Sequence, residues 1–172
     1  KRNTLESITT LNGNMEKFGL NVFSSIEKEE NRPKIATPKL QMEISGENWT
    51  EGDGIRSAIG ESCNAYSVIH MANYMATLAN GGVRNKLTLV KSTIDSNGIK
   101  NEIPAVKEDE IQIDKKNLEA VFEGMLNVTS GTQGTLRGVY KDFPVQVAGK
   151  TGTAEEADGR PSHTWFAGFA PY

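Results

Sequence analysis

The sequence predicts an α+β fold in which an antiparallel sheet packs against helices. Residues 64–79 and 114–128 each repeat apolar side chains at the spacing of a helix with one buried face. Residues 145–154 and 163–170 are expected to form strands, with a turn near Asp158-Gly159 between them. We expect these two strands to pair antiparallel and to pack on one of the two helices.

Both helices have recognisable ends. Ser62 or Asn64 is the expected N-cap of the first helix, and Gly81-Gly82 supplies its stop. Asp114 is the expected N-cap of the second helix. The apolar positions are Val68, Met71, Ala72, Met75, Leu78 and Ala79 in the first helix and Leu118, Val121, Phe122, Met125 and Leu126 in the second.

The other segments show weaker patterns. Residues 24–56 are polar and interrupted by proline and glycine, which predicts an extended, loop-rich excursion. Residues 83–113 favour short strands with a hairpin turn at Ser96-Asn97-Gly98. The strand at 163–170 is apolar on both faces, so we expect it inside a sheet covered on both sides, with Trp165 in the core.

Composition excludes several classes of function. The chain has 172 residues, a net charge of −3 and a pI of about 5.5, whereas nucleic-acid binding usually demands a basic face. Its single cysteine, Cys63, excludes an internal disulfide and supplies no metal cluster, and we expect no metal or cofactor. Apolar runs are too short to span a bilayer. Because the sequence opens on Lys1 and stops soon after its last strand, we expect residues 1–172 to be truncated at both ends.

The segment Lys150-Thr151-Gly152-Thr153 is the stretch of the sequence richest in candidate catalytic and substrate-binding residues. Lysine supplies a positive charge, the threonines supply hydroxyl donors, and glycine lets a ligand approach the backbone closely. Such a strand suits an anionic substrate bound along its main chain. The only two histidines are expected to be structural: His70 on the flank of a helix, and His163 at a strand end from which it could face a cleft.

Four segments carry specific sequence patterns: Phe18-Gly19-Leu20, the stretch from Ala58 to Gly82, the helix end Gly124 to Val128 with its Gly/Thr-rich tail, and Ala148 to Glu155 with the Trp165 strand. The last contains K-T-G, which is one of three motifs of the serine penicillin-recognising enzymes; its partners are S-x-x-K and S-x-N. Together the four segments resemble the transpeptidase domain of class B penicillin-binding proteins. The resemblance implies part of the penicillin-binding, β-lactamase-like transpeptidase fold, with residues 1–172 as its C-terminal portion.

The resemblance also implies a mechanism and a set of site residues. In the family, a serine attacks a stem peptide ending in D-Ala-D-Ala, and an amine of a neighbouring peptidoglycan strand captures the acyl-enzyme; β-lactams acylate the same serine. Lys150 and Thr153 would be catalytic, with the Thr153 N–H as an oxyanion donor. Thr151, Gly152 and Thr153 would bind substrate. The parent protein would lie on the extracytoplasmic face of the bacterial membrane, anchored by an N-terminal helix, among the cell-wall synthesis machinery.

The nucleophile is the missing part. In the family both serine motifs precede Phe18-Gly19-Leu20, and residues 1–17 contain neither. Two later matches, Ser25-Ile26-Glu27-Lys28 and Ser62-Cys63-Asn64, are interpreted as chance. Lys28 stands among carboxylates without an apolar face, so it should keep its proton instead of activating a serine.

Three functions therefore remain open. The chain is part of a D,D-transpeptidase that is inactive when excised, a non-catalytic module that binds a ligand or partner on the same scaffold, or a minimal enzyme that uses Ser25, Ser62 and Lys150. An S-x-x-K followed by S-x-N upstream of residue 1 would distinguish the first from the second.

Overall fold

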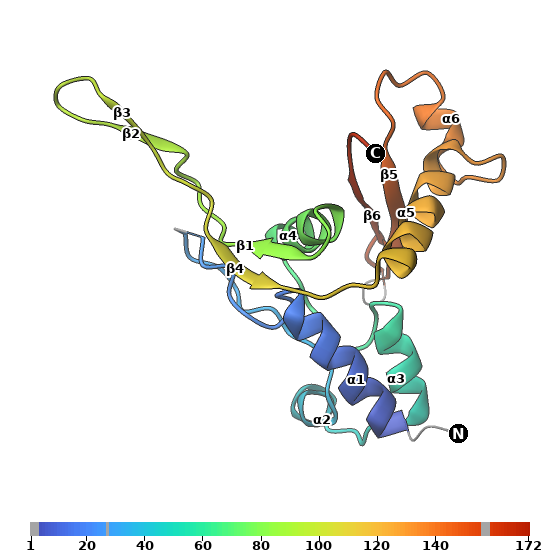
Figure 1. Ribbon diagram of the computed structural model, residues 1–172. Helices are drawn as coiled ribbons and strands as arrows, with labels where there is room; N and C mark the ends of the chain where they lie inside the picture. The colour runs from blue at the N-terminus through green and yellow to red at the C-terminus, as the bar shows by residue number, and fades with distance from the viewer. Residues whose placement is uncertain (1–3, 27, 156–158) are drawn as a thin grey trace. The chain divides into compact units, whose positions relative to one another are not determined.

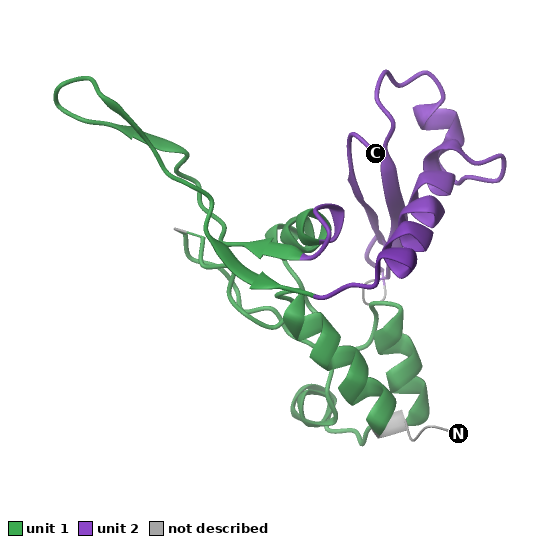
Figure 2. Ribbon diagram, in the orientation of Figure 1, with its two compact units in different colours: residues 1–77, 83–111 green, residues 78–82, 112–172 purple. Residues whose placement is uncertain are grey.

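The computed structural model describes residues 4–26, 28–155 and 159–172 and divides the chain into two compact units. The first unit comprises Lys1–Thr77 and Val83–Ile111, and the second comprises Leu78–Gly82 and Gln112–Tyr172 (Figure 2). Of the sequence patterns above, Glu27 and Asp158 lie outside the described residues.

The first unit is largely helical. It holds α1 (Thr4–Lys17), α2 (Pro38–Ser45), α3 (Glu51–Ala58) and most of α4 (Val68–Ala79), and α1 packs on α3 (Figure 1). The prediction of a loop-rich excursion over residues 24–56 is therefore wrong for α2 and α3. Thr37 caps α2, its hydroxyl accepting from the Leu40 N–H, and Pro38 occupies the first turn, where proline favours a helix.

Helix α4 begins four residues later than expected, at Val68 instead of Asn64. The N–H groups of His70 and Met71 donate hydrogen bonds to the Ser67 carbonyl oxygen, so Ser67 occupies the N-cap position of this helix. At the other end Gly81 and Gly82 have φ angles of 84° and 109°, as the expected stop requires.

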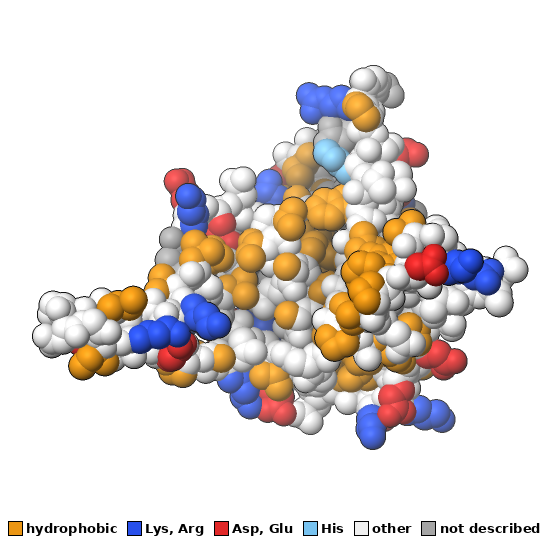
Figure 3. Space-filling view, turned by 90° about the horizontal axis from the view of Figure 1, so that it is seen from above, with side chains coloured by type: hydrophobic (Ala, Val, Ile, Leu, Met, Phe, Trp, Pro, Cys, Tyr) orange, Lys and Arg blue, Asp and Glu red, His pale blue; other side chains and the backbone are white. Residues whose placement is uncertain are grey.

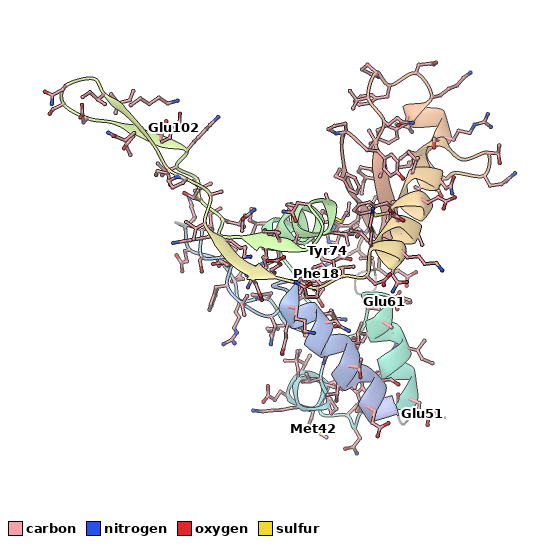
Figure 4. All side chains as sticks on the ribbon, in the orientation of Figure 1. Phe18, Met42, Glu51, Glu61, Tyr74 and Glu102 are labelled. Carbon is pink, nitrogen blue, oxygen red and sulfur yellow. The ribbon has the colours of Figure 1, made fainter. Side chains whose placement is uncertain are left out.

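Aromatic packing joins α4 to the end of α1. Phe18 meets Tyr74 edge to face, with ring centroids 5.1 Å apart (Figure 4). Gly19 follows with a φ of 80°, and Leu20 is buried. The Phe-Gly-Leu segment is thus a turn that closes α1 onto the core of the first unit.

His70 lies on α4, and its side chain is buried. Its side chain is 1% exposed, with Nδ1 2.6 Å from the Ser67 hydroxyl and Nε2 3.6 Å from a Glu30 carboxylate oxygen. That carboxylate accepts from the backbone N–H and the hydroxyl of Ser24, at 2.6 and 2.7 Å. These contacts give His70 a structural role, as expected, but in the core of the unit.

Two antiparallel strand pairs complete the first unit. β1 (Val83–Asn85) pairs with β4 (Lys107–Glu110), and β2 (Ser92–Ile94) pairs with β3 (Lys100–Glu102) farther out on the same arm (Figure 1). The hairpin turn falls where the sequence predicts it: Gly98 has a φ of 80°, and the Asp95 carboxylate accepts from the N–H groups of Asn97 and Ile99. Apolar side chains lie on the surface of this arm (Figure 3).

The second unit places a helix against a strand pair. α5 (Lys115–Ser130) packs on β5 (Ala148–Ala154), which runs antiparallel to β6 (His163–Phe169), and α6 (Arg137–Tyr140) lies between α5 and β5 in the chain. Asp114 caps α5 as predicted, its carboxylate accepting from the Asn117 N–H. The expected antiparallel pair on a helix is confirmed.

One expectation for β6 is wrong. Among the described residues β6 pairs with β5 alone, Phe166 remains 41% exposed, and Trp165 is only half-buried. The apolar run of this strand thus has too few neighbours within the unit to be covered on both faces.

Candidate functional site

The K-T-G-T residues occupy the middle of β5. Lys150 stands opposite Ala167, Thr151 opposite Phe166, Gly152 opposite Trp165, and Thr153 opposite Thr164. Because successive residues of a strand point to opposite faces, Thr151 and Thr153 share one face of the ladder, while Lys150 and Gly152 share the other. The two threonine side chains are separated by two residues, or about 7 Å along the strand. That spacing suits two hydroxyls converging on one small anion.

The Lys150 side chain is exposed, and its ammonium donates a hydrogen bond of 2.6 Å to the Thr151 carbonyl oxygen. The positive charge is thus held beside the strand backbone, next to the segment where the threonine hydroxyls lie. Gly152 is also exposed, and a Cβ added there would meet only the Trp165 Cβ, at 3.6 Å. This part of β5 is open to a ligand.

The beginning of β5 is held much more tightly than its middle. Val147 and Ala148 are buried, and the hydroxyl of buried Thr129 on α5 donates to the Val147 carbonyl at 2.5 Å. The ring of Phe166 folds over Gly149, where an added Cβ would lie 2.4 Å from two ring carbons. The K-T-G-T segment, in which Thr151 is half-buried and the other three residues are exposed, therefore continues a strand whose start is tightly packed.

Neither alternative serine has the setting of a nucleophile. Ser25 and Lys28 are exposed and lie outside the helices, and Ser62 is an exposed turn residue. Both serines have positive φ angles, 58° and 66°. Asn64 is also not the expected helix cap, since its carbonyl oxygen accepts from the Ala36 N–H and the Tyr66 hydroxyl.

Other features of the described residues add no catalytic group. A pocket of about 320 Å³ lies at the end of α5, lined by Gly124, Asn127, Val128 and residues 131–135, none of them charged. No cluster of three or more potential metal-ligating side chains occurs in the part of the chain that the structure describes. No described helix is both long and apolar enough to cross a membrane.

The strand register also reveals residues that sequence reasoning missed. Thr164 lies directly opposite Thr153 and on the same face, whereas His163 and Trp165 share the face of Lys150. The alternation of side chains along each strand was visible in the sequence, but the pairing of position 153 with position 164 was not. Both threonines are exposed.

Comparison with known proteins identifies the family. The chain belongs to the penicillin-binding protein transpeptidase domains, whose family model matches residues 10–172. It is 28% identical to the peptidoglycan D,D-transpeptidase MrdA of Haemophilus influenzae over 96% of this chain and 28% of that protein. It is 31% identical to penicillin-binding protein 2A of Bacillus subtilis over 85% of this chain and 20% of that protein. The resemblance seen in the sequence is confirmed.

Solved structures confirm the fold. Penicillin-binding protein 2B of Streptococcus pneumoniae strain R6 superposes with a TM-score of 0.76 at 25% identity, covering 95% of this chain and 27% of that chain. The penicillin-binding protein of Helicobacter pylori, solved in complex with MreC, gives a TM-score of 0.78 at 24% identity, over 98% and 30% of the two chains. The chain thus spans less than a third of the length of these relatives.

Proposed function

We propose that residues 1–172 are the C-terminal portion of the transpeptidase domain of a serine-type D,D-transpeptidase, which cross-links peptidoglycan stem peptides and binds penicillin. The observation that carries the proposal is the placement of Lys150, Thr151, Gly152 and Thr153 in a row on β5, all exposed except half-buried Thr151, in a chain of this family. The nucleophilic serine belongs to an upstream part of the same protein.

The proposed reaction has two steps. The serine oxygen attacks the carbonyl of the penultimate D-Ala, the peptide bond breaks, and the terminal D-Ala leaves with a proton on its amine. An amine of a second stem peptide then attacks the ester, a new peptide bond forms, and the serine recovers its proton. A β-lactam acylates the same serine when its ring amide opens.

The chain supplies binding and charge stabilisation to this reaction. Thr151 and Thr153 hydroxyls bind the carboxylate of the terminal D-Ala, which fixes the scissile bond relative to the serine. The Thr153 N–H donates to the developing oxyanion, a contact typically worth about 10²–10³ in rate. The Lys150 ammonium holds the proton network around the serine, and Gly152 lets the substrate approach the strand.

The protein is proposed to act at the extracytoplasmic face of the bacterial membrane, in the cell-wall synthesis machinery, with the stem peptide and β-lactams as its ligands and an N-terminal membrane anchor. The Helicobacter pylori relative solved with MreC supports an assembly partner of this kind. A non-catalytic binding module is the second candidate, favoured by the exposed, non-helical setting of Ser25 and Ser62.

Labelling with a fluorescent penicillin tests the proposal. The 172-residue chain should not be labelled, whereas the full-length protein should be, because acylation needs the serine as well as the strand. Lys150→Ala in the full-length protein should slow acylation by about two orders of magnitude or more. Lys100→Ala, which removes an exposed strand lysine in the first unit, is the matched control and should leave acylation unchanged.

Intact-mass spectrometry separates the candidates. A full-length protein that forms no adduct supports the non-catalytic module and refutes the transpeptidase. A stoichiometric adduct on the 172-residue chain, mapped to Ser25 or Ser62, would support the minimal enzyme instead.

A further inference from the structure

A third threonine, Thr164, lies beside Thr151 and Thr153, the two proposed carboxylate-binding residues. Thr164 of β6 is the cross-strand partner of Thr153, and both side chains are exposed on the face that also carries Thr151. Directly paired residues of an antiparallel ladder have Cβ atoms about 5 Å apart, close enough for two threonine hydroxyls to hydrogen-bond. Within the described structure the two hydroxyls are not bonded to each other, and rotation about one side-chain torsion moves each of them.

The neighbouring positions cannot take this role. Phe166, opposite Thr151, has no hydrogen-bonding group and covers Gly149 with its ring. His163 and Trp165 stand on the opposite face of the ladder, with Lys150. Thr164 is therefore the one polar side chain of β6 that shares the face of the two threonines within the K-T-G-T stretch.

A hydroxyl that binds a carboxylate must point its proton at it. A free threonine hydroxyl turns among several acceptors, and holding it in one orientation costs entropy on binding. A neighbouring hydroxyl that donates to its oxygen removes this freedom and polarises the O–H bond, which strengthens the outgoing hydrogen bond.

We propose that Thr164 is a positioning residue for the Thr153 hydroxyl. Thr164 donates to Thr153 Oγ1, and Thr153 donates to the carboxylate of the stem peptide or of a β-lactam. The proposal rests on the function proposed above and adds a residue of β6 to it. Thr164 acts through Thr153 and does not itself contact the substrate.

The test uses the full-length protein and a fluorescent penicillin. Thr164→Val keeps the β-branched shape and removes the hydroxyl, so it should lower the second-order acylation constant about three- to tenfold, the usual size for one hydrogen bond. Thr164→Ser should restore it. The loss should appear in the concentration dependence of acylation and not in the limiting rate. Thr93→Val, at an exposed strand position of the first unit, is the matched control and should change nothing.

Two further measurements separate positioning from a structural effect. In the Thr153→Val background, Thr164→Val should have no additional effect, because the chain of hydrogen bonds is already broken. A β-lactam whose carboxylate is esterified should react more slowly and be insensitive to Thr164→Val.

Each outcome is decisive. Unchanged acylation by Thr164→Val, additive losses in the double variant, or failure of Thr164→Ser to restore the rate would overturn the positioning role. If the unaltered full-length protein forms no acyl adduct, the proposed transpeptidase function fails, and the role of Thr164 fails with it.

Discussion

The Thr129 hydroxyl on α5 donates a 2.5 Å hydrogen bond to the carbonyl oxygen of Val147, immediately before β5. Thr129 is 1% exposed, and the residues that it joins are 18 positions apart. This bond fixes the start of the strand whose middle carries the K-T-G-T residues, so the packing of the second unit positions these candidate site residues.

Replacing Thr129 by valine should destabilise the fold without changing side-chain shape. The Val147 carbonyl would be left buried without its partner, which costs about 1–3 kcal/mol. Urea unfolding of the chain followed by circular dichroism measures the loss, and Thr129→Ser should recover much of it. A midpoint unchanged in Thr129→Val would show that this bond contributes nothing to stability.

Gly149 and Gly124 should respond in opposite directions to alanine. At Gly149 the new Cβ would lie 2.4 Å from two carbons of the Phe166 ring, so the ring must move and the unit should lose about 1–3 kcal/mol. At Gly124, inside α5, the new Cβ meets no atom within 4 Å, and alanine should stabilise the helix by about 0.5–1 kcal/mol. Thermal unfolding of the two variants would contradict this prediction if their melting temperatures shifted in the same direction.

Asp53 should make the first unit sensitive to acid. Hydrogen bonds from the Thr50 hydroxyl, the Arg56 guanidinium and the Thr50 N–H lower the pKa of the Asp53 carboxyl to about 2 from its ordinary 3.8. Because the folded pKa lies below the unfolded one, this contribution is complete above pH 3.8 and is lost as the pH falls towards 2.

An Asp53→Asn variant should therefore be less stable than the parent at neutral pH and should lose less stability between pH 4 and 2. Urea unfolding across that range measures both. Asp95→Asn, in the hairpin turn, is a suitable comparison because the Asp95 carboxylate also accepts backbone bonds but lies exposed. Parallel pH curves for Asp53→Asn and the parent would refute the role of Asp53.

Asn64→Ala should lower the free energy of unfolding by more than the loss of a helix cap would. The Asn64 carbonyl oxygen accepts from the N–H of Ala36, which is fully buried, at 2.8 Å, and its amide donates to the Ser57 hydroxyl at 3.1 Å. Leaving the Ala36 N–H without a partner should cost about 1–3 kcal/mol. Asn64→Asp retains an oxygen that can accept from the Ala36 N–H, so this variant should lose less stability. If both variants unfold at the parent's urea midpoint, these bonds do not stabilise the unit.

Structural features that depend only on residues close together in the chain could be predicted from the sequence. The Asp114 cap, the Gly81-Gly82 stop and the Asp95-to-Ile99 turn are local, because each is a bond or a backbone angle set by residues at most four positions apart. The K-T-G-T strand is predicted from the same kind of local pattern, because an apolar stretch followed by threonine and glycine favours a strand that a ligand can approach. The family resemblance rests on such local stretches, and the candidate site residues follow from that resemblance.

Local patterns gave the wrong prediction where helix-start signals and loop signals occurred in the same segment. Thr37-Pro38 and Thr50 with Asp53 are helix-start patterns, yet the prolines and glycines of residues 24–56 outweighed them in the prediction, and α2 and α3 were missed.

Long-range contacts needed the folded chain. Asn64 reaches Ala36, 28 positions away, and Thr153 pairs with Thr164, a register that depends on the number of residues between the two strands. A shift of one residue in that register would carry Thr164 to the other face, away from Thr153. Spacing along the chain reports which side chains share an element, whereas the bonds between elements depend on how loops close and on what the core can bury.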